Sequence, residues 1–294
     1  MASMRDIQRR KSSVSSIGQI TKAMKLVSTV KLQKTKQRAE QAKPYFEKMY
    51  RTVAHILSHS GQIRHPYLQG GESKKKCIIT ITSNRGLAGG YNSGVEKLVT
   101  GSGFAREDIE LITIGRKGKD FLERRGYHVR ADYSDVMNNP MYSDAREISE
   151  AVLKAFTDGE IGEIYVAYTA FKNTVVHVPT LMKLLPVEFT EEELEAGTQK
   201  TRQREADLNT PMNYEPAEDQ SLDIIIPKYV TSILFGSLIE AAASENGARM
   251  QAMDSATSNA EEMIEKLSLQ YNRARQSSIT QELTEIIAGA ESIS

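Results

Sequence analysis

The sequence predicts an α/β protein in which a long antiparallel two-helix coiled coil carries a central α/β domain. Apolar residues recur every three or four positions along both ends of the chain, and short runs rich in β-branched residues occur only in the middle. We therefore expect a helix over residues 1–60, an α/β domain over 75–190 and a second helix over 222–294. A polar, acidic excursion over 191–221 is expected before the last helix.

The N-terminal segment has the pattern of one helix face. Pro44 is its only residue that favours a kink, because proline removes a helix hydrogen bond. The stretch KLQKTKQR, residues 31–38, has almost no apolar stripe, so we expect it to face solvent or charged surfaces. The apolar positions that define the face are Ile7, Val14, Ile17, Met24, Val27, Ala39, Ala42, Phe46, Met49, Val53 and Ile56.

The C-terminal segment repeats this pattern after Pro227. Two helices of roughly 55 to 65 residues would each reach about 80 to 95 Å, and helices of that length need a partner in water. Because a compact domain connects them, they can pair with each other only in antiparallel fashion. The apolar positions of this second face are Val230, Leu234, Leu238, Met253, Ala256, Ala260, Met263, Leu267, Tyr271, Ala274 and Ser278.

The middle of the chain has the pattern of a Rossmann-like domain. Residues 77–82, 109–115 and 163–171 are short β-branched or aromatic runs that predict buried strands. Residues 116–125 and 143–157 lie between them and are expected to be helices, and strands that alternate with helices indicate a parallel sheet. The second helix offers Ser143 or Asp144 as N-cap, with a capping-box spacing from Asp144 to Glu147.

The charge distribution is uneven although the whole chain is balanced. The chain holds 38 Lys and Arg against 38 Asp and Glu, but residues 1–43 hold eleven bases and two acids. Residues 188–223 hold eleven acids and three bases. The basic helix could follow a phosphate backbone, yet it has no aromatic residue before Tyr45, so a solvated face or an acidic protein partner is favoured.

The termini and the single cysteine restrict the class of protein. Cys77 is the only cysteine, so an intrachain disulfide and a cysteine metal site are both excluded. The N-terminal residues lack the apolar core of a signal peptide, and we expect no segment able to span a bilayer. Any membrane association is therefore expected to occur through partners.

The segment SNRGLAGGYN, residues 83–92, is a glycine-rich turn between a predicted strand and a predicted helix. This is where backbone N–H groups can hold a phosphate. The spacing of Gly86, Gly89 and Gly90 matches neither a Walker A loop nor a dinucleotide fingerprint. A tight turn with close strand–helix packing is therefore favoured over a protein-contact site, and both are favoured over a nucleotide site.

No catalytic or metal signature is found. His55 and His59 are four residues apart, but the sequence between them is not the HExxH pattern of a zinc site. The serines of residues 12–16 lack the GxSxG elbow of a nucleophile. We therefore expect no active site, no cofactor and no metal.

Four sequence motifs in this order resemble the gamma subunit of F-type ATP synthases, over nearly the whole chain. They are IGQITKAMKLVSTVKL near the N-terminus, SNRGLAGGYN in the middle, and SENGARMQAMDSATSNA with NRARQSSITQELTEIIAGA at the end. The sequence departs from the pattern at Asn84 and Ala88, where many members have Asp and Cys. With Cys77 alone, it also lacks the redox cysteine pair of chloroplast members.

The resemblance implies a central-stalk rotor subunit without an active site of its own. It would couple ion flow through the membrane c-ring to ATP synthesis and hydrolysis on the beta subunits, at the cytoplasmic face of the cell membrane as a peripheral subunit. The implied partners are three alpha and three beta subunits, epsilon and the c-ring, with no nucleic acid. The residues implied to make coupling contacts are Met24, Lys25, Lys31, Lys34, Lys36, Arg249, Gln276, Thr280 and Glu282.

Two other classes of function remain as alternatives. A nucleotide-binding enzyme would rest on the SNRGLAGG turn alone, and binding of ATP or NAD by the chain would favour it. A coiled-coil scaffold or nucleic-acid binder would rest on the basic N-terminal helix, and salt-dependent affinity for duplex DNA would favour that reading.

Overall fold

A computed structural model describes residues 4–59, 65–71, 73–187 and 218–291. The chain divides into two compact units, one made of residues 1–29 with 249–294 and the other of residues 30–248. Helices α1 (Met4–His59) and α6 (Glu218–Glu291) contribute to both. Between them, in chain order, lie β1 (Lys76–Ile81), α2 (Tyr91–Thr100), η1 (Arg106–Asp108), β2 (Ile109–Ile114), α3 (Arg116–Arg124), β3 (His128–Asp132), η2 (Ser134–Asn138), α4 (Tyr142–Thr157), β4 (Glu163–Phe171) and β5 (His177–Leu185).

The two terminal helices are long, as the sequence predicts, and α6 is longer than the roughly 55 to 65 residues expected. α1 has 56 residues and continues through Pro44, and α6 has 74 residues. α6 begins at Glu218, four residues before the predicted start at residue 222, and it contains Pro227. Burial of Leu222 and Ile226 before it offsets the helix hydrogen bond that proline removes. The predicted acidic excursion lies outside the described residues except for 218–221, which are helical.

In the first unit, α1 and α6 pair in antiparallel fashion. A Cβ atom built on Gly18 would lie 3.4 Å from the Cβ of Ala260. Further along α1, the Thr21 hydroxyl lies 2.8 Å from the Thr257 hydroxyl, a position earlier in α6. The partners therefore move backwards along α6 as the chain advances along α1, which confirms the predicted direction.

The residues at this helix seam differ in part from the predicted ones. Ile17 and Val27 were expected on the seam, yet they are 52% and 57% exposed. On α6, Met263 is also exposed. Small or polar side chains take their places, because a close approach of two helices excludes bulky ones. The buried residues of the first unit are Ile7, Thr21, Ser28, Met253, Ala260 and Leu267.

The second unit contains one five-stranded sheet in the order β3-β2-β1-β4-β5. The predictions for β1, β2 and β4 are confirmed, and these strands run parallel to one another as expected. The sequence interpretation missed β3, which pairs parallel to β2, and β5, which pairs antiparallel to β4. Both are edge strands, and β5 contains Pro179, which the interior of a sheet would not tolerate.

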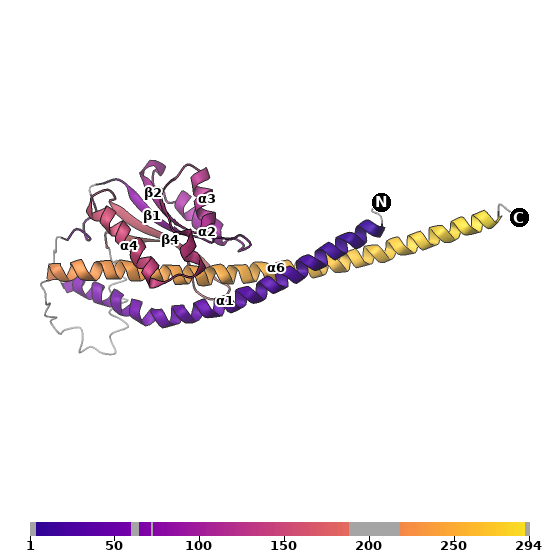
Figure 1. Cartoon of the computed structure of the whole chain (residues 1–294), viewed down its shortest axis with the longest axis horizontal. Coiled ribbons are helices and arrows are strands. Elements are labelled where there is room, and N and C mark those ends of the chain that lie inside the picture. Colours follow the sequence, from indigo (N-terminus) through magenta and orange to yellow (C-terminus); the bar gives the residue numbers. More distant parts are fainter. Residues whose placement is uncertain (1–3, 60–64, 72, 188–217, 292–294) are drawn as a thin grey trace. The chain divides into compact units, whose positions relative to one another are not determined.

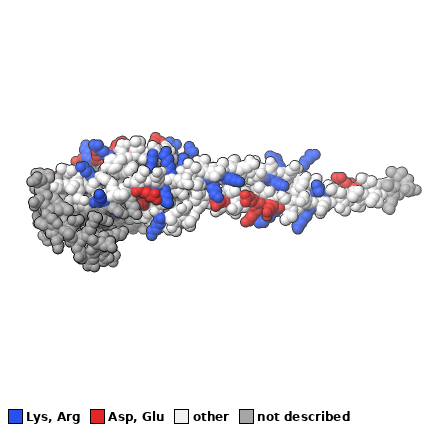
Figure 2. Space-filling model, turned by 90° about the horizontal axis from the view of Figure 1, so that it is seen from below, with Lys and Arg blue, Asp and Glu red and all other residues white. Residues whose placement is uncertain are grey.

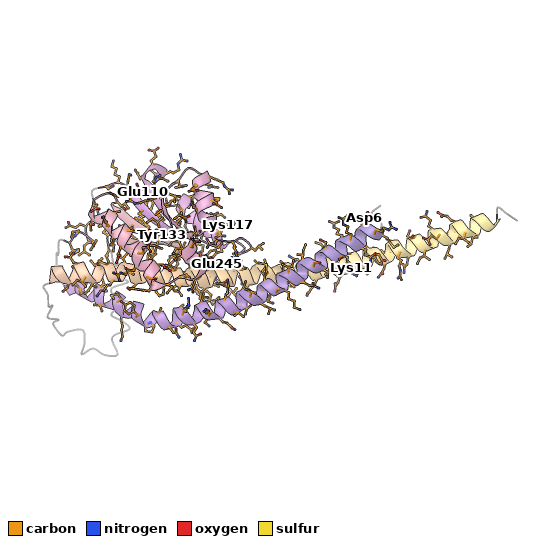
Figure 3. All side chains as sticks on the ribbon, viewed as in Figure 1. Asp6, Lys11, Glu110, Lys117, Tyr133 and Glu245 are labelled. Carbon is orange, nitrogen blue, oxygen red and sulfur yellow. The ribbon has the colours of Figure 1, made fainter. Side chains whose placement is uncertain are left out.

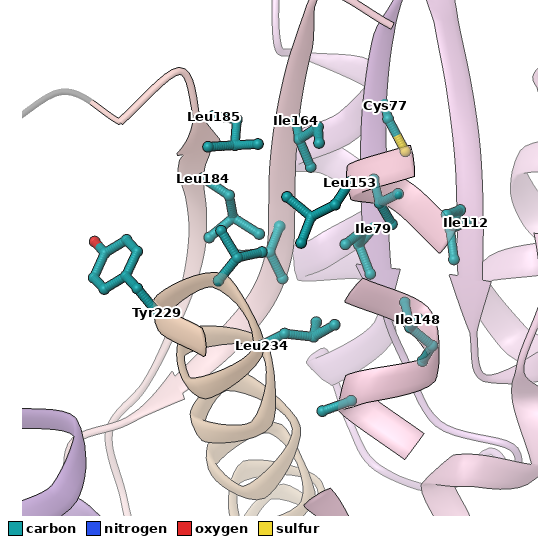
Figure 4. Close-up of a cluster of buried hydrophobic side chains, with 14 of the residues drawn as sticks. Cys77, Ile79, Ile112, Ile148, Leu153, Ile164, Leu184, Leu185, Tyr229 and Leu234 are labelled. Atoms are coloured by element: carbon teal, nitrogen blue, oxygen red, sulfur yellow. The ribbon is translucent and has the colours of Figure 1, made fainter. Parts of the chain in front are cut away.

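Helices cover both faces of the sheet. α2 and α3 lie on one face, while α4 and α6 lie on the other (Figure 1). The face toward α4 and α6 carries the larger apolar cluster, where Ile79 and Ile164 of the sheet meet Ile148 of α4 and Leu234 of α6 (Figure 4). Each fully buried aliphatic side chain of this kind contributes about 1.5–3 kcal/mol. This core fixes the sheet against the first half of α6.

The predicted helices of the sheet region are confirmed, with one correction at a helix start. α4 has Met141 as its N-cap, in place of the predicted Ser143 or Asp144. Asp144 is the third residue of the helix, and its carboxylate accepts a hydrogen bond from the Met141 backbone N–H at 2.9 Å. The acidic side chain thus satisfies a free N–H of the first turn from inside the helix.

The expectation that no segment could span a bilayer is wrong when only the length and the composition of a helix are considered. Among the described residues, α6 contains an 18-residue window with a mean hydropathy of 1.5. However, 56% of that window is buried inside the protein. We interpret it as the core helix that packs against the sheet.

Candidate contact surfaces

The glycine-rich turn connects the end of β1 to the start of α2 (Tyr91–Thr100), as the sequence predicts. Leu87 and Gly89 have φ values of 64° and 55°, in the left-handed region that favours glycine. Leu87 is a bulky residue in that conformation, and its side chain is largely exposed. The predicted close packing of strand and helix occurs at Gly118 of α3 instead of at the glycines of the turn. A Cβ atom built on Gly118 would lie 2.6 Å from the Thr82 side chain, which follows β1.

Polar side chains fix this turn to its neighbours. Asn84 Nδ2 donates to the Ser134 carbonyl at 2.8 Å, and Asn84 Oδ1 accepts from the Arg116 backbone N–H at 3.1 Å. The Lys117 N–H donates to the Ser83 carbonyl at 3.1 Å, and Figure 3 labels Lys117 at α3. At the start of α2, the helix that follows the turn, the Tyr91 N–H donates to the Ala88 carbonyl at 3.2 Å and the Gly94 N–H to the Gly90 carbonyl at 3.0 Å. These N–H groups are used within the protein, which favours a structural turn over a phosphate site.

Candidate catalytic groups form no site within the described part of the chain. No group of three or more His, Cys, Asp or Glu residues there could hold a metal ion. Ser16 lies on α1 and donates to the Ser12 carbonyl at 3.1 Å. The side chains of His55 and His59 lie outside the described residues. His65 is buried, and its Nε2 lies 3.1 Å from the Asp223 carboxylate, an arrangement that fixes a loop to α6.

The predicted contact residues of α1 are placed on different surfaces. Lys25 Nζ lies 2.6 Å from Asp254 Oδ1 of α6, so this side chain joins the two helices. Met24 beside it is half-buried. Lys31, Lys34 and Lys36 are exposed, as expected for this stretch, and Lys36 Nζ is 3.8 Å from Glu40.

The predicted contact residues of α6 fall into two groups along the helix. Arg249 is half-buried near the start of the first unit's α6 segment. Gln276, Thr280 and Glu282 are exposed. The Thr280 hydroxyl donates to the Gln276 carbonyl at 2.9 Å, so the amide of Gln276 and the carboxylate of Glu282 are the stronger groups offered to a partner.

Sequence reasoning missed a row of exposed apolar side chains. The sequence contains a pattern that could have revealed these side chains. Alternating steps of four and three residues from Ile7 lead to Gly18, Thr21 and Ser28. The apolar residues next to these positions then lie outside the seam. Such surfaces mark sites of protein contact. Its members are Ile17, Ile20, Leu26, Val27 and Val30 on α1 and Leu269, Ile279, Leu283, Ile286 and Ile287 on α6.

Charged side chains of the sheet are largely paired with one another. Glu110 of β2 (labelled in Figure 3) accepts from Lys75 Nζ at 2.7 Å and from Arg130 Nη1 at 2.8 Å. Burial alone would raise the pKa of Glu110, but the hydrogen bonds and charges of Lys75 and Arg130 lower it overall. Arg130 also pairs with Glu160. This network is suited to holding strand ends together.

The charges visible on one face of the molecule are mixed in sign. Figure 2 shows Lys and Arg side chains interspersed with Asp and Glu side chains, with wide uncharged areas between them. This pattern differs from the single-sign stripe typical of nucleic-acid binding. The apolar rows and scattered polar groups fit protein partners better.

Comparison with known proteins assigns the chain to a family. A sequence profile for the family described as ATP synthase matches residues 3–293. The ATP synthase gamma chain of Lachnoclostridium phytofermentans is 65% identical over 296 aligned residues, covering 100% of both chains. The chain belongs to the ATP synthase gamma chain family. The sodium ion specific gamma chain of Acetobacterium woodii is 43% identical, covering 99% of this chain and 98% of the relative.

Chains of solved ATP synthase structures share this fold. A chain of the Euglena gracilis mitochondrial ATP synthase matches with a TM-score of 0.68 at 17% identity, covering 99% of this chain and 94% of that chain. A chain of the central stalk and c-ring structure from Tetrahymena thermophila matches with a TM-score of 0.57 at 23% identity, covering 81% and 99%. The gamma chain is a non-catalytic stalk subunit, in keeping with the resemblance seen in the sequence.

Proposed function

We propose that the coiled coil of α1 and α6 turns inside a head of three alpha and three beta subunits, while the sheet side of the chain meets epsilon and the membrane c-ring. Rotational coupling in the central stalk is the known role of the gamma chain family. In this role an asymmetric shaft contacts each beta subunit differently and changes its nucleotide affinity in turn. Catalysis takes place on beta.

The observation that carries the proposal is the antiparallel pair itself. Its seam uses small residues such as Gly18, Thr21 and Ala260, and many of its large apolar side chains are exposed. A self-sufficient coiled coil would bury its large apolar residues. A shaft that turns within a sleeve of other subunits would instead present them to that sleeve.

We assign the beta contacts to the residues that the family resemblance implies. Lys31, Lys34 and Lys36 present exposed ammonium groups suited to acidic loops. On α6, Gln276 and Glu282 present an amide and a carboxylate. Met24, Lys25, Arg249 and Thr280 complete the set, with Lys25 acting also through its bond to Asp254.

The proposal extends to the organisation and location of the chain. We assign residues 1–60 and 218–294 to the shaft helices, 75–190 to the Rossmann-like domain and 191–217 to an excursion. The subunit would lie at the cytoplasmic face of the cell membrane as a peripheral subunit held by its partners. The buried apolar stretch of α6 supports this, because it is used in the protein core.

Rotation can be tested directly in the reconstituted head. Glu107 is exposed, whereas Cys77 is fully buried with its pKa raised to about 12 by burial, so Glu107→Cys offers a single reactive thiol. With alpha and beta subunits fixed to a surface and a bead attached at position 107, ATP should drive rotation in one direction. ATP hydrolysis at the normal rate with a stationary bead would refute the proposal.

The contact residues can be tested through coupling. Arg249→Ala and Gln276→Ala should lower the number of ions moved per ATP, because each removes a side chain that we assign to a contact with beta. Assembly with alpha and beta should change less. Glu262→Ala, an exposed residue of the same helix outside the proposed set, is the matched control. Equal losses of assembly and coupling would count against specific contacts.

A further inference from the structure

The hairpin formed by β4 and β5 contacts α6 through specific side chains. The Phe171 backbone N–H donates to Glu240 Oε2 at 3.4 Å, and the Tyr168 hydroxyl is hydrogen-bonded to Ser237. Further along α6, the ring of His177 lies against Gly247. All of these residues belong to the second unit. The hairpin therefore meets α6 at several heights along the helix.

At Gly247 the ring of His177 leaves no room for a side chain on the helix. A Cβ built there would lie 2.6 Å from His177 Cε1 and 3.0 Å from Nε2, distances that real Cβ atoms do not adopt with a neighbour. Glycine inside a helix costs about 1 kcal/mol relative to alanine, and here the imidazole occupies the space of the missing methyl group. The helix thus has a notch, and the ring fills it.

The ring of His177 is held rigidly in that notch. His177 is paired directly opposite Phe171 in the hairpin, and their ring centroids are 5.8 Å apart. Both ring nitrogens are shut off from solvent. Neither ring nitrogen has a hydrogen-bond partner in the structure. Burial lowers the pKa of His177, and the nearby Thr174 backbone offsets this only in part. The protein therefore bears a desolvation cost at this position that an apolar side chain would avoid.

The face of α6 under the hairpin is made of small residues. Ser237, Ser244 and Gly247 are buried and follow one another at steps of seven and three, so they lie on one side of the helix. Small side chains allow the strands to approach the helix closely. Glu240 stands on the same side and supplies the polar contact.

We propose that His177 and Gly247 form an interlock that carries torque between the β4–β5 hairpin and α6. This inference rests on the proposed rotor function, because torque passes through the joint only if the sheet side is driven and the helix does work in the head. Apolar packing is non-directional, and packed elements can slide past each other by shear. A ring seated in a notch resists sliding along the helix and turning about it, since close-packed interiors transmit strain. His177 and Gly247 are thus positioning residues.

The interlock can be tested in the assembled rotor with the bead at position 107. During pauses at low ATP the head holds the helix pair, and the angular variance of the bead reports the stiffness of the rotor. His177→Ala should raise this variance about two-fold, because the notch is left empty. His177→Phe should keep the parental variance, since it retains a flat ring. Gly247→Ala should also raise the variance, because the methyl group displaces the ring.

Control variants distinguish the loss of the His177–Gly247 contact from a general loss of structure. Val175→Ala, at the exposed tip of the same hairpin, should leave the variance unchanged. The double variant His177→Ala with Gly247→Ala should recover part of the stiffness, because the methyl group refills the notch. Parental variance in His177→Ala, or a double variant looser than both single ones, would overturn the inference. A parental chain that fails to rotate would instead refute the proposed function.

Discussion

Thr21 of α1 and Thr257 of α6 share a hydrogen bond of 2.8 Å between their side-chain hydroxyls. Each hydroxyl also lies within hydrogen-bond distance of a carbonyl of its own helix, that of Gly18 at 3.0 Å and that of Met253 at 2.8 Å. The two helix backbones are therefore close, and short polar side chains fill the seam. The coiled coil depends on close approach rather than on large knobs.

The close approach predicts opposite effects for two substitutions at Gly18. Gly18→Ala should be neutral or stabilising by up to about 1 kcal/mol, because its Cβ would meet Ala260 at 3.4 Å and alanine favours the helix. Gly18→Leu should destabilise by about 1–3 kcal/mol, since the larger side chain forces the helices apart. Thermal unfolding followed by circular dichroism measures both. A leucine variant as stable as the alanine variant would show that the seam is not closely packed.

Asn84 should not be replaceable by the aspartate found in many family members. Its amide nitrogen donates to the Ser134 carbonyl, and a carboxylate cannot donate this bond. We expect Asn84→Asp to cost about 1–2 kcal/mol of unfolding free energy, although the bond from the Arg116 N–H would be kept. Asn84→Ser, which retains one donor, is the matched comparison. Equal stability of parent and aspartate variant would contradict this account.

Glu110 should contribute stability that disappears in acid. Its folded pKa is lowered by Lys75 and Arg130 against the effect of burial, so the folded state prefers the charged form. The stabilisation is present above the ordinary pKa of a glutamate and is lost as pH falls through the lowered folded value. Glu110→Gln should therefore cost about 2 kcal/mol at pH 7 and much less near pH 3. Urea unfolding at the two pH values measures this, and a pH-independent cost would refute it.

The sequence predicts the parts of this fold that depend on apolar pattern. β1, β2 and β4 are buried runs, and their strands were found. β3 is an edge strand with three of its five residues exposed, and β5 contains Pro179, so neither has the pattern of a buried strand. α6 continues through Pro227, because burial around this residue overrides its local propensity.

The contact surfaces were only partly predictable for a different reason. Apolar spacing alone placed Ile17 and Val27 in the seam, whereas the structure puts Gly18 and Ser28 there. A sequence rule that assumes large residues face inward fails when the inner contact is tight and large apolar residues stay exposed on the outer surface. The notch at Gly247 was equally invisible, because only the fold brings His177 to it.

His177 should make stability depend on pH near neutrality. Burial lowers its folded pKa below the ordinary value of about 6.5, so the unfolded chain takes up a proton that the folded chain refuses. Stability should therefore fall as pH decreases from about 6.5 toward the lowered folded value, and should level off below it. His177→Phe removes this group while keeping a ring, so its stability should change less between pH 7.5 and pH 5.5 than that of the parent. His128→Gln, at an exposed position, is the control and should retain the parental slope. Thermal unfolding midpoints measured at the two pH values test this prediction. An equal change of midpoint with pH in the parent and in His177→Phe would show that His177 is not protected from protonation.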